Sequence, residues 1–205
     1  MKKIYRLSLA FLLLSSISCA QHEHHEATSS ISLITGVEPQ PLLSQALRLN
    51  EALKFLGSAL KPEDEKRLTA LHSKPLNAET VKTIQEILDS YCLAMVDINP
   101  ESRVKVLRGP AKAKLVQDGW TSFLVKVHND AGITPQLMVG SPNAQHALHI
   151  SSSEPKVKAE NVLSQGQVEN RFLEMQMYHN RPLQSNLSGL KLEYAVLQEC
   201  RKKML

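Results

Sequence analysis

The chain has 205 residues, of which 42% are hydrophobic, 21% charged and only 4% aromatic, and its formal net charge is +4. Residues 1–20 hold three of the 24 basic residues and none of the 20 acidic ones, so the remaining chain has a net charge of only +1. Because this net charge is small and the sequence has no basic patch with interspersed aromatic residues, nucleic acid is excluded as a partner.

The first twenty residues have the three parts of a secretion signal. Lys2, Lys3 and Arg6 form a positive segment, residues 7–14 form an apolar run, and small residues follow. The run is far shorter than the roughly 20 apolar residues of a membrane-spanning helix. We therefore predict a signal peptide at residues 1–20 and an exported protein, periplasmic or extracellular. No later stretch is longer or more apolar, so the mature chain is expected to be soluble.

Two cleavage sites compete at the end of this signal. Cutting after Ala20 places Ser18 and Ala20 at the small-residue positions that signal peptidase requires. Cutting before Cys19 leaves an N-terminal cysteine for lipid attachment, although Ser16 stands where lipoprotein signals usually carry leucine. The first cut predicts a secreted protein, and the second predicts a membrane-anchored lipoprotein. A membrane partner is therefore expected only if Cys19 is lipidated.

Residues 21–38 form a His/Ser-rich stretch without periodicity, which predicts a disordered tail. Its first residues are the densest set of metal-ligand side chains in the chain: His22, Glu23, His24, His25 and Glu26. Imidazoles and carboxylates bind zinc, copper or nickel, but a fixed centre needs a scaffold that orients the ligands. The alternatives are an adaptable metal site on the tail and a solvated linker. No cofactor is predicted.

Residues 39–97 are predicted to form a small antiparallel helical unit. Leucines and alanine recur at spacings of three and four from Leu42 to Leu60, which predicts a helix of about five turns. Pro62 is expected to end this helix and to lie in the first turn of a second, short one, with acidic residues 63–65 at its positive end. Pro75 is expected to close the second helix.

The third predicted helix begins with Asn77 as its N-cap and carries Glu79 in its first turn. Its apolar positions have the spacing of one helical face. They are Val81, Ile84, Leu88 and Tyr91. The next residue, Cys92, is expected to be packed at the end of this apolar stripe.

From Arg103 onward apolar and polar residues alternate, which is typical of strands. The predicted strands are 104–106, 115–116, 120–128, 137–139, 173–177 and 190–196, with a hairpin turn at Asp118-Gly119. We predict an α+β protein in which residues 98–200 form an antiparallel immunoglobulin-like sandwich, followed by a charged end at 201–205. Since a full sandwich has seven strands or more, it is predicted to be incomplete, and its exposed edge predicts self-association.

The remaining histidines are interpreted as surface residues. His146 and His149 have a His-x-x-His spacing, but they stand in a polar loop without a third ligand, whereas zinc sites use three or four. His128 is expected on the outward side of its strand, and Asp118 and Asp130 are expected to satisfy backbone groups in turns.

Two cysteines remain beyond the signal, Cys92 and Cys200. In an oxidising compartment the two could form a disulfide, and spacing alone does not fix connectivity. The alternative is a buried free Cys92 and an exposed Cys200. Trp120, the only tryptophan, starts a predicted strand and is expected to be a core anchor.

A set of short strings carries a resemblance to a known group of proteins. The strings are ILDSYCL at 87–93, INPESRVKV at 98–106, RGPA at 108–111, QDGW at 117–120, FLVKVHN at 123–129, SPNA at 141–144 and GLKLEY at 189–194. Through these strings, residues 40–198 resemble the N-terminal region of large exported proteins of planctomycete-type bacteria. The C-terminal part of those proteins is similar to CehA/McbA metallohydrolases of the PHP class.

The resemblance implies little chemistry for this chain. In such proteins the metal-binding residues lie in the hydrolase part, so no catalytic residue is carried over to the N-terminal region. Past Val196 the chain departs from the pattern and ends at Leu205. A truncated gene and a free-standing relative of the N-terminal module both fit this ending.

Three functional hypotheses follow. The sequence shows no nucleophile elbow, no glycine-rich phosphate loop and no reactive-cysteine signature. The first hypothesis is therefore an exported non-catalytic module that binds or positions a protein or saccharide partner. The second is a fragment of a larger secreted metal-dependent hydrolase. The third is a periplasmic metal-handling protein that uses the histidine-rich tail.

Overall fold

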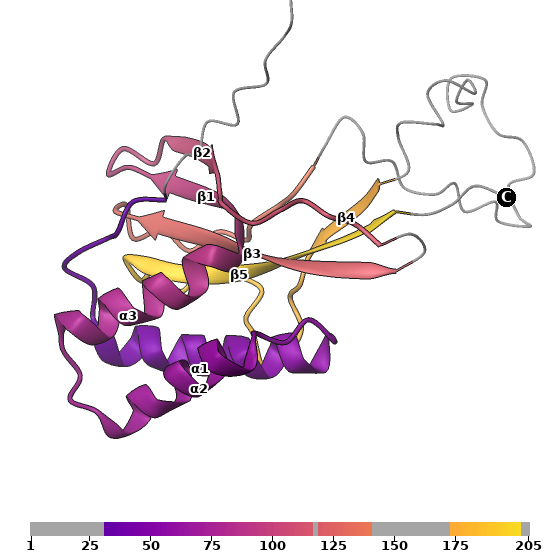
Figure 1. Cartoon of the computed structure of the whole chain (residues 1–205). Helices are drawn as coiled ribbons and strands as arrows, with labels where there is room; N and C mark the ends of the chain where they lie inside the picture. The colour runs from indigo at the N-terminus through magenta and orange to yellow at the C-terminus, as the bar shows by residue number, and fades with distance from the viewer. Residues whose placement is uncertain (1–30, 117–118, 141–172, 202–205) are drawn as a thin grey trace, which may run out of the picture.

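The computed structural model describes residues 31–116, 119–140 and 173–201, which form the α+β fold predicted from the sequence (Figure 1). Three helices lie against one face of a curled five-stranded sheet. The helices are α1 (Pro39–Phe55), α2 (Pro62–Ala70) and α3 (Ala78–Leu88), and the short 3-10 helices η1 (Leu71–Ser73) and η2 (Asp89–Tyr91) follow α2 and α3. The strands are β1 (Cys92–Ile98), β2 (Val104–Arg108), β3 (Trp120–Asn129), β4 (Leu173–Met177) and β5 (Leu192–Arg201).

Helix α1 is shorter than the sequence predicts. It begins at Pro39, whose fixed φ suits a first helical position, and it ends at Phe55 rather than near Pro62. Gly57 adopts the left-handed conformation with φ of 69°. The N–H of Gly57 donates to the carbonyl of Lys54, and the N–H of Ser58 donates to that of Leu53. This is a Schellman motif, so a glycine ends the helix and the apolar spacing up to Leu60 overstates its length.

Helices α2 and α3 follow the sequence prediction closely. Helix α2 has Pro62 in its first turn, followed by acidic residues 63–65. Helix α3 starts after Asn77, whose Oδ1 accepts hydrogen bonds from the backbone N–H groups of Glu79 at 3.0 Å and Thr80 at 3.1 Å. The Thr80 hydroxyl in turn accepts from the N–H of Asn77. The predicted N-cap is confirmed, in the form of a capping box.

Removing this cap is expected to destabilise the fold measurably. Asn77→Ala leaves two backbone donors without their partner and is expected to lower the free energy of unfolding by about 1 kcal/mol. Urea denaturation followed by circular dichroism checks the value. Thr83→Ala, in the same helix, is the matched control, because the Thr83 hydroxyl only donates back to the Glu79 carbonyl and its loss is expected to be near neutral.

The sheet is mixed, so the predicted antiparallel sheet is wrong. The strand order is β2-β1-β3-β5-β4. Strand β3 runs parallel to β1, whereas the other three neighbouring pairs are antiparallel. After the β1–β2 hairpin the chain returns to the other side of β1 and runs in the same direction as β1. Alternation within a strand indicates which side chains share a face but not which strands become neighbours.

The two packed sheets of an immunoglobulin-like sandwich are not confirmed, since all the described strands belong to one sheet. Residues 92–98, which the sequence analysis left without a strand, form β1 near the middle of that sheet. The strands predicted at 115–116 and 137–139 are absent from the structure, which shows only an isolated bridge between Gln136 and Asn186 there.

Two apolar clusters flank the sheet. The larger one joins the helices to the near face of the sheet through residues such as Leu49, Ile84 and Leu124. The smaller one lies on the far face and includes Val127 and Leu197, packed against residues between 131 and 139. The helices and strands therefore share a core, while the division into units at residues 97 and 98 stays a prediction. Among the described helices none has the length and apolar character needed to cross a membrane.

Candidate functional site

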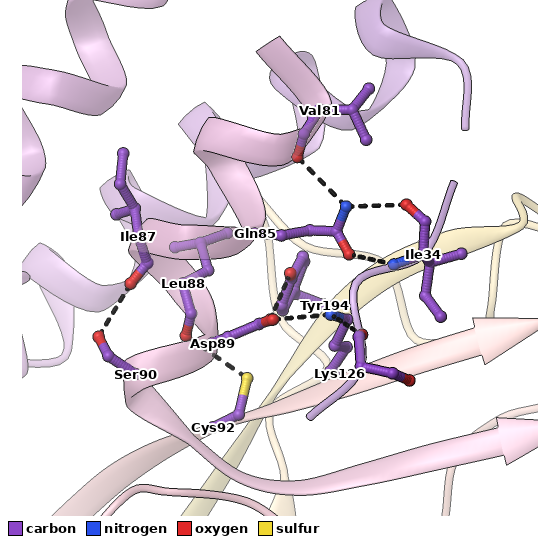
Figure 2. A network of polar contacts seen from close by, with 11 residues as sticks. Ile34, Val81, Gln85, Ile87, Leu88, Asp89, Ser90, Cys92, Lys126 and Tyr194 are labelled. Atoms are coloured by element: carbon purple, nitrogen blue, oxygen red, sulfur yellow. Dashed lines mark hydrogen bonds and ion pairs between the residues drawn. The ribbon is translucent and has the colours of Figure 1, made fainter. Parts of the chain in front are cut away.

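A buried polar network joins the helices to the sheet (Figure 2). Lys126, on β3, has a fully buried side chain, and its Nζ lies 2.7 Å from Asp89 Oδ2. The same ammonium donates to the carbonyl of Ser32 at 2.9 Å. The hydroxyl of Tyr194, on β5, donates to Asp89 Oδ1 at 2.8 Å. Asp89 lies in η2, directly after α3, so one carboxylate ties this end of the helical layer to two strands.

The charges of this network depend on one another. Burial raises the pKa of Asp89, and the hydrogen bonds from Lys126 and Tyr194 oppose that rise. Burial also raises the pKa of Tyr194 well above its usual value, and the neighbouring Asp89 carboxylate adds to the rise. The Asp89 carboxylate is thus paired with the ammonium group of Lys126, whose side chain has no contact with solvent. These groups are engaged in holding the layers together.

The segment before α1 is held by the same region. Gln85, on α3, accepts a hydrogen bond from the N–H of Ile34 at 2.8 Å and donates to the carbonyls of Ile34 at 2.9 Å and Val81 at 3.3 Å (Figure 2). Together with the bond from Lys126 to Ser32, these contacts fix residues 31–38 beside α3. That stretch, which the sequence analysis assigned to the tail, is part of the fold.

The two cysteines form no disulfide with each other. On β3, Cys92 lies opposite Leu124 and Cys200 lies opposite Trp120. Four residues along a strand span about 13 Å, whereas bridged cysteines have Cα atoms no more than about 7 Å apart. The alternative placed Cys200 on the surface, and this is also wrong, because Cys200 is buried.

Cys92 is poorly suited to act as a nucleophile. Its side chain is completely buried, and burial raises the pKa of the thiol, with the Asp89 carboxylate adding to the rise. The thiol contacts the Leu88 carbonyl at 3.5 Å. Since the thiolate is the reactive form of cysteine, a buried thiol with a raised pKa has a packing role.

His128 is not a simple surface residue. Its side chain is 15% exposed, and Nδ1 lies 2.6 Å from Asp97 Oδ1 while Nε2 lies 3.2 Å from Asp130 Oδ1. When the ring is protonated at both nitrogens it donates to both carboxylates. His128 thus links β1, β3 and the turn after β3. Asp130 lies in that turn as predicted, but its carboxylate contacts the side chains of His128 and Lys191, so the predicted bonding to backbone groups is not confirmed. Across the described residues no group of three or more His, Cys, Asp or Glu side chains is arranged to hold a metal ion.

The outer edge of β2 presents backbone groups to solvent. The N–H of Gly109 donates to the Leu93 carbonyl at 2.8 Å, and the N–H of Asn99 donates to that of Arg103 at 3.1 Å. In an antiparallel pair the bonded residues alternate, so residues 103, 105 and 107 face β1. The N–H and C=O groups of Val104 and Val106 therefore point away from the sheet. β2 is the outermost strand on this side of the described sheet.

The side chains of β2 make this edge apolar and basic. Val104 is 61% exposed and Val106 is 63% exposed. In register they lie opposite Ile98 and Val96, on the far face of the sheet from the helices. Residues 102–116 contain five basic residues and no acidic one: Arg103, Lys105, Arg108, Lys112 and Lys114. Two of them have partners within the chain, because Arg103 pairs with Glu101 and the Arg108 guanidinium donates to the carbonyls of Leu93, Gly109 and Ala111. We call the outward backbone and side chains of Val104 and Val106, with these basic neighbours, the β2 edge site.

Several sequence predictions lie outside the described residues. They include the signal peptide with Cys19, the five tail ligands from His22 to Glu26, the turn residue Asp118 and the histidine pair His146 and His149. Each of these stays a prediction.

Comparisons with known proteins add no relative. No family model matches the chain, and neither a curated protein nor a solved structure matches it. The resemblance to the N-terminal region of CehA/McbA-like exported proteins therefore stays a prediction that rests on the strings themselves.

The buried network could not be predicted from the sequence, whereas strand β2 could. Lys126 stands between Val125 and Val127, and a lysine inside a strand with apolar neighbours signals either an edge strand or a buried ion pair. Its partner Asp89 lies 37 residues earlier, and no local pattern connects the two. The alternation of Val104 and Val106 with Lys105 gave the strand, but not its place at the edge.

Proposed function

We propose that this chain is an exported, non-catalytic binding module that takes an extended, acidic segment of a partner protein onto the β2 edge site. The observation that carries the proposal is the edge itself: two outward-facing backbone units, at Val104 and Val106, beside side chains that are 61% and 63% exposed. Peptide segments bind such edges by adding a strand, in which main-chain hydrogen bonds give affinity and alternate side chains give specificity.

Charge favours an acidic partner over a second copy of this chain. In an antiparallel pairing of β2 with itself, basic side chains of one copy would come close to basic side chains of the other, because every charged residue from 103 to 108 is basic. Like charges placed opposite one another destabilise a strand pair, and lysine on an edge strand opposes self-pairing. Glutamate or aspartate at alternate positions of a partner segment would instead complement the lysines around β2, Lys105, Lys112 and Lys114.

The non-catalytic part of the proposal is supported by how the buried reactive groups are used. Lys126, Asp89 and Tyr194 satisfy one another in the core, and the Cys92 thiol has a pKa raised by burial. Catalytic groups need contact with a substrate and a pKa suited to proton transfer. These groups instead hold the helical layer and the segment before α1 on the sheet.

The proposal predicts binding of a synthetic peptide that alternates valine and glutamate. Fluorescence anisotropy of the labelled peptide is expected to show saturable binding to the chain. Val106→Pro removes an outward N–H without removing a bond to β1, since proline is tolerated on the open side of an edge strand. The Val106→Pro variant is expected to bind the peptide about tenfold more weakly or worse. A tenfold loss corresponds to about 1.4 kcal/mol, roughly the contribution of one main-chain hydrogen bond to the peptide.

Matched controls separate strand addition from attraction between charges. Val106→Thr keeps the N–H and the strand preference and is expected to bind within a few-fold of the unmodified chain. A peptide with glycine in place of valine carries the same charge without the strand preference, and a peptide with lysine in place of glutamate reverses the charge. Equal binding of the valine and glycine peptides would contradict the proposal. Dimerisation through β2 in sedimentation experiments would make a second copy the partner instead.

A further inference from the structure

A cavity lies where strand β4 ends and β5 continues alone on its outer side. Strand β4 pairs with residues 197–201 of β5, so residues 192–196 have β3 on one side but no β4 on the other. The chain after β4 reaches toward α1 there (Figure 1) and lines a cavity of about 100 Å³. One water molecule needs about 10–15 Å³ of such volume, so the cavity has room for several waters or for a ligand with a few non-hydrogen atoms.

The polar lining comes from three separate segments. Gln45 and Arg48 are contributed by α1, Glu193 by β5, and His179 and residues 183–188 by the chain after β4. Gln45 Oε1 accepts a hydrogen bond from the N–H of Tyr194 at 3.0 Å. A side chain from α1 thus takes the place that a neighbouring strand would occupy, and the outer edge of β5 opens toward the cavity.

Glu193 is a buried carboxylate without a cationic partner among the described residues. It is 4% exposed. Its oxygens accept hydrogen bonds from the N–H and the hydroxyl of Ser188, each at 3.1 Å. Burial raises its pKa, and the bonds from Ser188 oppose that rise. An ionised carboxylate in such a place gains from a cation supplied by a ligand.

Arg48 supplies the opposite charge on the same cavity. It lies on the exposed side of α1, one turn after Gln45, so the two side chains share a helix face. Guanidinium groups bind carboxylates with two parallel hydrogen bonds. Strand alternation places the Glu193 side chain on the far face of the sheet, with Val127 and Leu197, whereas α1 covers the near face, so the two charges line the cavity from opposite sides of the open edge of β5. A ligand that carries both charges and lies across this edge would complement them.

We propose that this cavity binds a small zwitterion with the chemistry of an α-amino acid, whose ammonium group contacts Glu193 and whose carboxylate contacts Arg48. The site is separate from the β2 edge site, because β2 and β4 lie at opposite ends of the sheet. The two proposals can therefore fail independently.

The test is a titration of the isotope-labelled chain with L-alanine, followed by the amide resonances of Ser188 and Tyr194. L-alanine at millimolar concentration is expected to shift both resonances saturably, and ethanolamine or propionate, each of which lacks one charge, is expected to bind more weakly. Glu193→Gln is expected to weaken alanine binding about tenfold or more, since hydrogen bonds to a charged group are the strong ones.

Glu199→Gln is the matched control. Glu199 is also on β5, is 5% exposed and has a pKa raised by burial, but it does not line the cavity. This variant is expected to bind alanine within about twofold of the unmodified chain. Arg48→Met, at an exposed position, is expected to weaken alanine binding and to leave ethanolamine binding unchanged, which keeps the test decisive if Glu193→Gln fails to fold. Absence of saturable shifts with alanine, or equal alanine affinity in the Arg48→Met variant, would overturn the proposal.

Discussion

Lys126→Met is expected to lower the free energy of unfolding by about 3–5 kcal/mol, because it leaves a buried carboxylate without its cation. Lys126 is fully buried, and its ammonium is 2.7 Å from Asp89 Oδ2. The variant also removes the bond to the Ser32 carbonyl, which holds the segment before α1. Urea denaturation at neutral pH measures the loss. Lys105→Met, at an exposed position of β2, is the control and is expected to change stability by no more than about 0.5 kcal/mol.

The pH dependence of this variant follows from the direction of the Asp89 pKa. Burial raises that pKa in the folded state, and without Lys126 the main opposing influence is absent. A carboxyl group whose folded pKa is raised favours the folded state at low pH, and this contribution is lost as the pH rises through the folded pKa. The stability deficit of Lys126→Met is therefore expected to shrink as the pH is lowered toward the unfolded pKa of aspartate, about 3.9.

A triple variant distinguishes the buried charge from the packing of the same site. Asp89→Leu, Lys126→Met and Tyr194→Phe together replace the network by apolar side chains of similar size. Such replacements are often neutral or stabilising, so the triple variant is expected to recover most of the stability that Lys126→Met loses. If Lys126→Met alone costs less than about 1 kcal/mol, or if the triple variant is the less stable of the two, the assigned role of the network is wrong.

Gly109→Ala is expected to destabilise the fold by about 3 kcal/mol or more, at or above the upper end of the usual cost of overpacking. A Cβ atom at Gly109 would lie 2.1 Å from the Cys92 carbonyl oxygen and 2.7 Å from its carbonyl carbon. Both are backbone atoms and cannot rotate away. The chain is held there by the bonds from Gly109 to Leu93 and from Ala111 to Cys92, so relief of the clash would separate β2 from the start of β1.

Gly140→Ala is the matched control for this prediction. A Cβ atom at Gly140 meets no atom of the described residues within 4 Å, so the substitution is expected to be neutral or slightly stabilising. Thermal unfolding of the two variants beside the unmodified chain checks the difference. A Gly109→Ala variant as stable as the Gly140→Ala variant would contradict the close approach of residues 92 and 109.

Local signals in the sequence predicted the helices and several strands, because capping and alternation are local. Asn77 and the acidic residues 63–65 marked helix starts that the structure confirms. The end of α1 was missed, since the apolar spacing continues to Leu60 while Gly57 already reverses the chain. In that case a single residue with a left-handed conformation outweighs several residues of periodic pattern.

Strand neighbours and the buried polar network could not be predicted in the same way. The parallel pairing of β1 with β3 depends on the path of the chain between β2 and β3, for which alternation within each strand holds no information. Asp89 and Tyr194 lie 105 residues apart, and only the folded sheet brings them to Lys126. The acidic character that we propose for the partner of the β2 edge site rests on basic residues that can be read from the sequence. The position of β2 at the edge of the sheet could not be read from it.

Amide hydrogen exchange at Val104 and Val106 tests the central proposal most directly. These two N–H groups face away from β1, so in the chain alone they are expected to exchange much faster than the β1-facing N–H of Leu107. Addition of the alternating valine and glutamate peptide is expected to slow exchange at Val104 and Val106 and to leave Leu107 little changed. Protection that does not change with the peptide, or that appears equally with the glycine-containing control, would contradict strand addition at this edge.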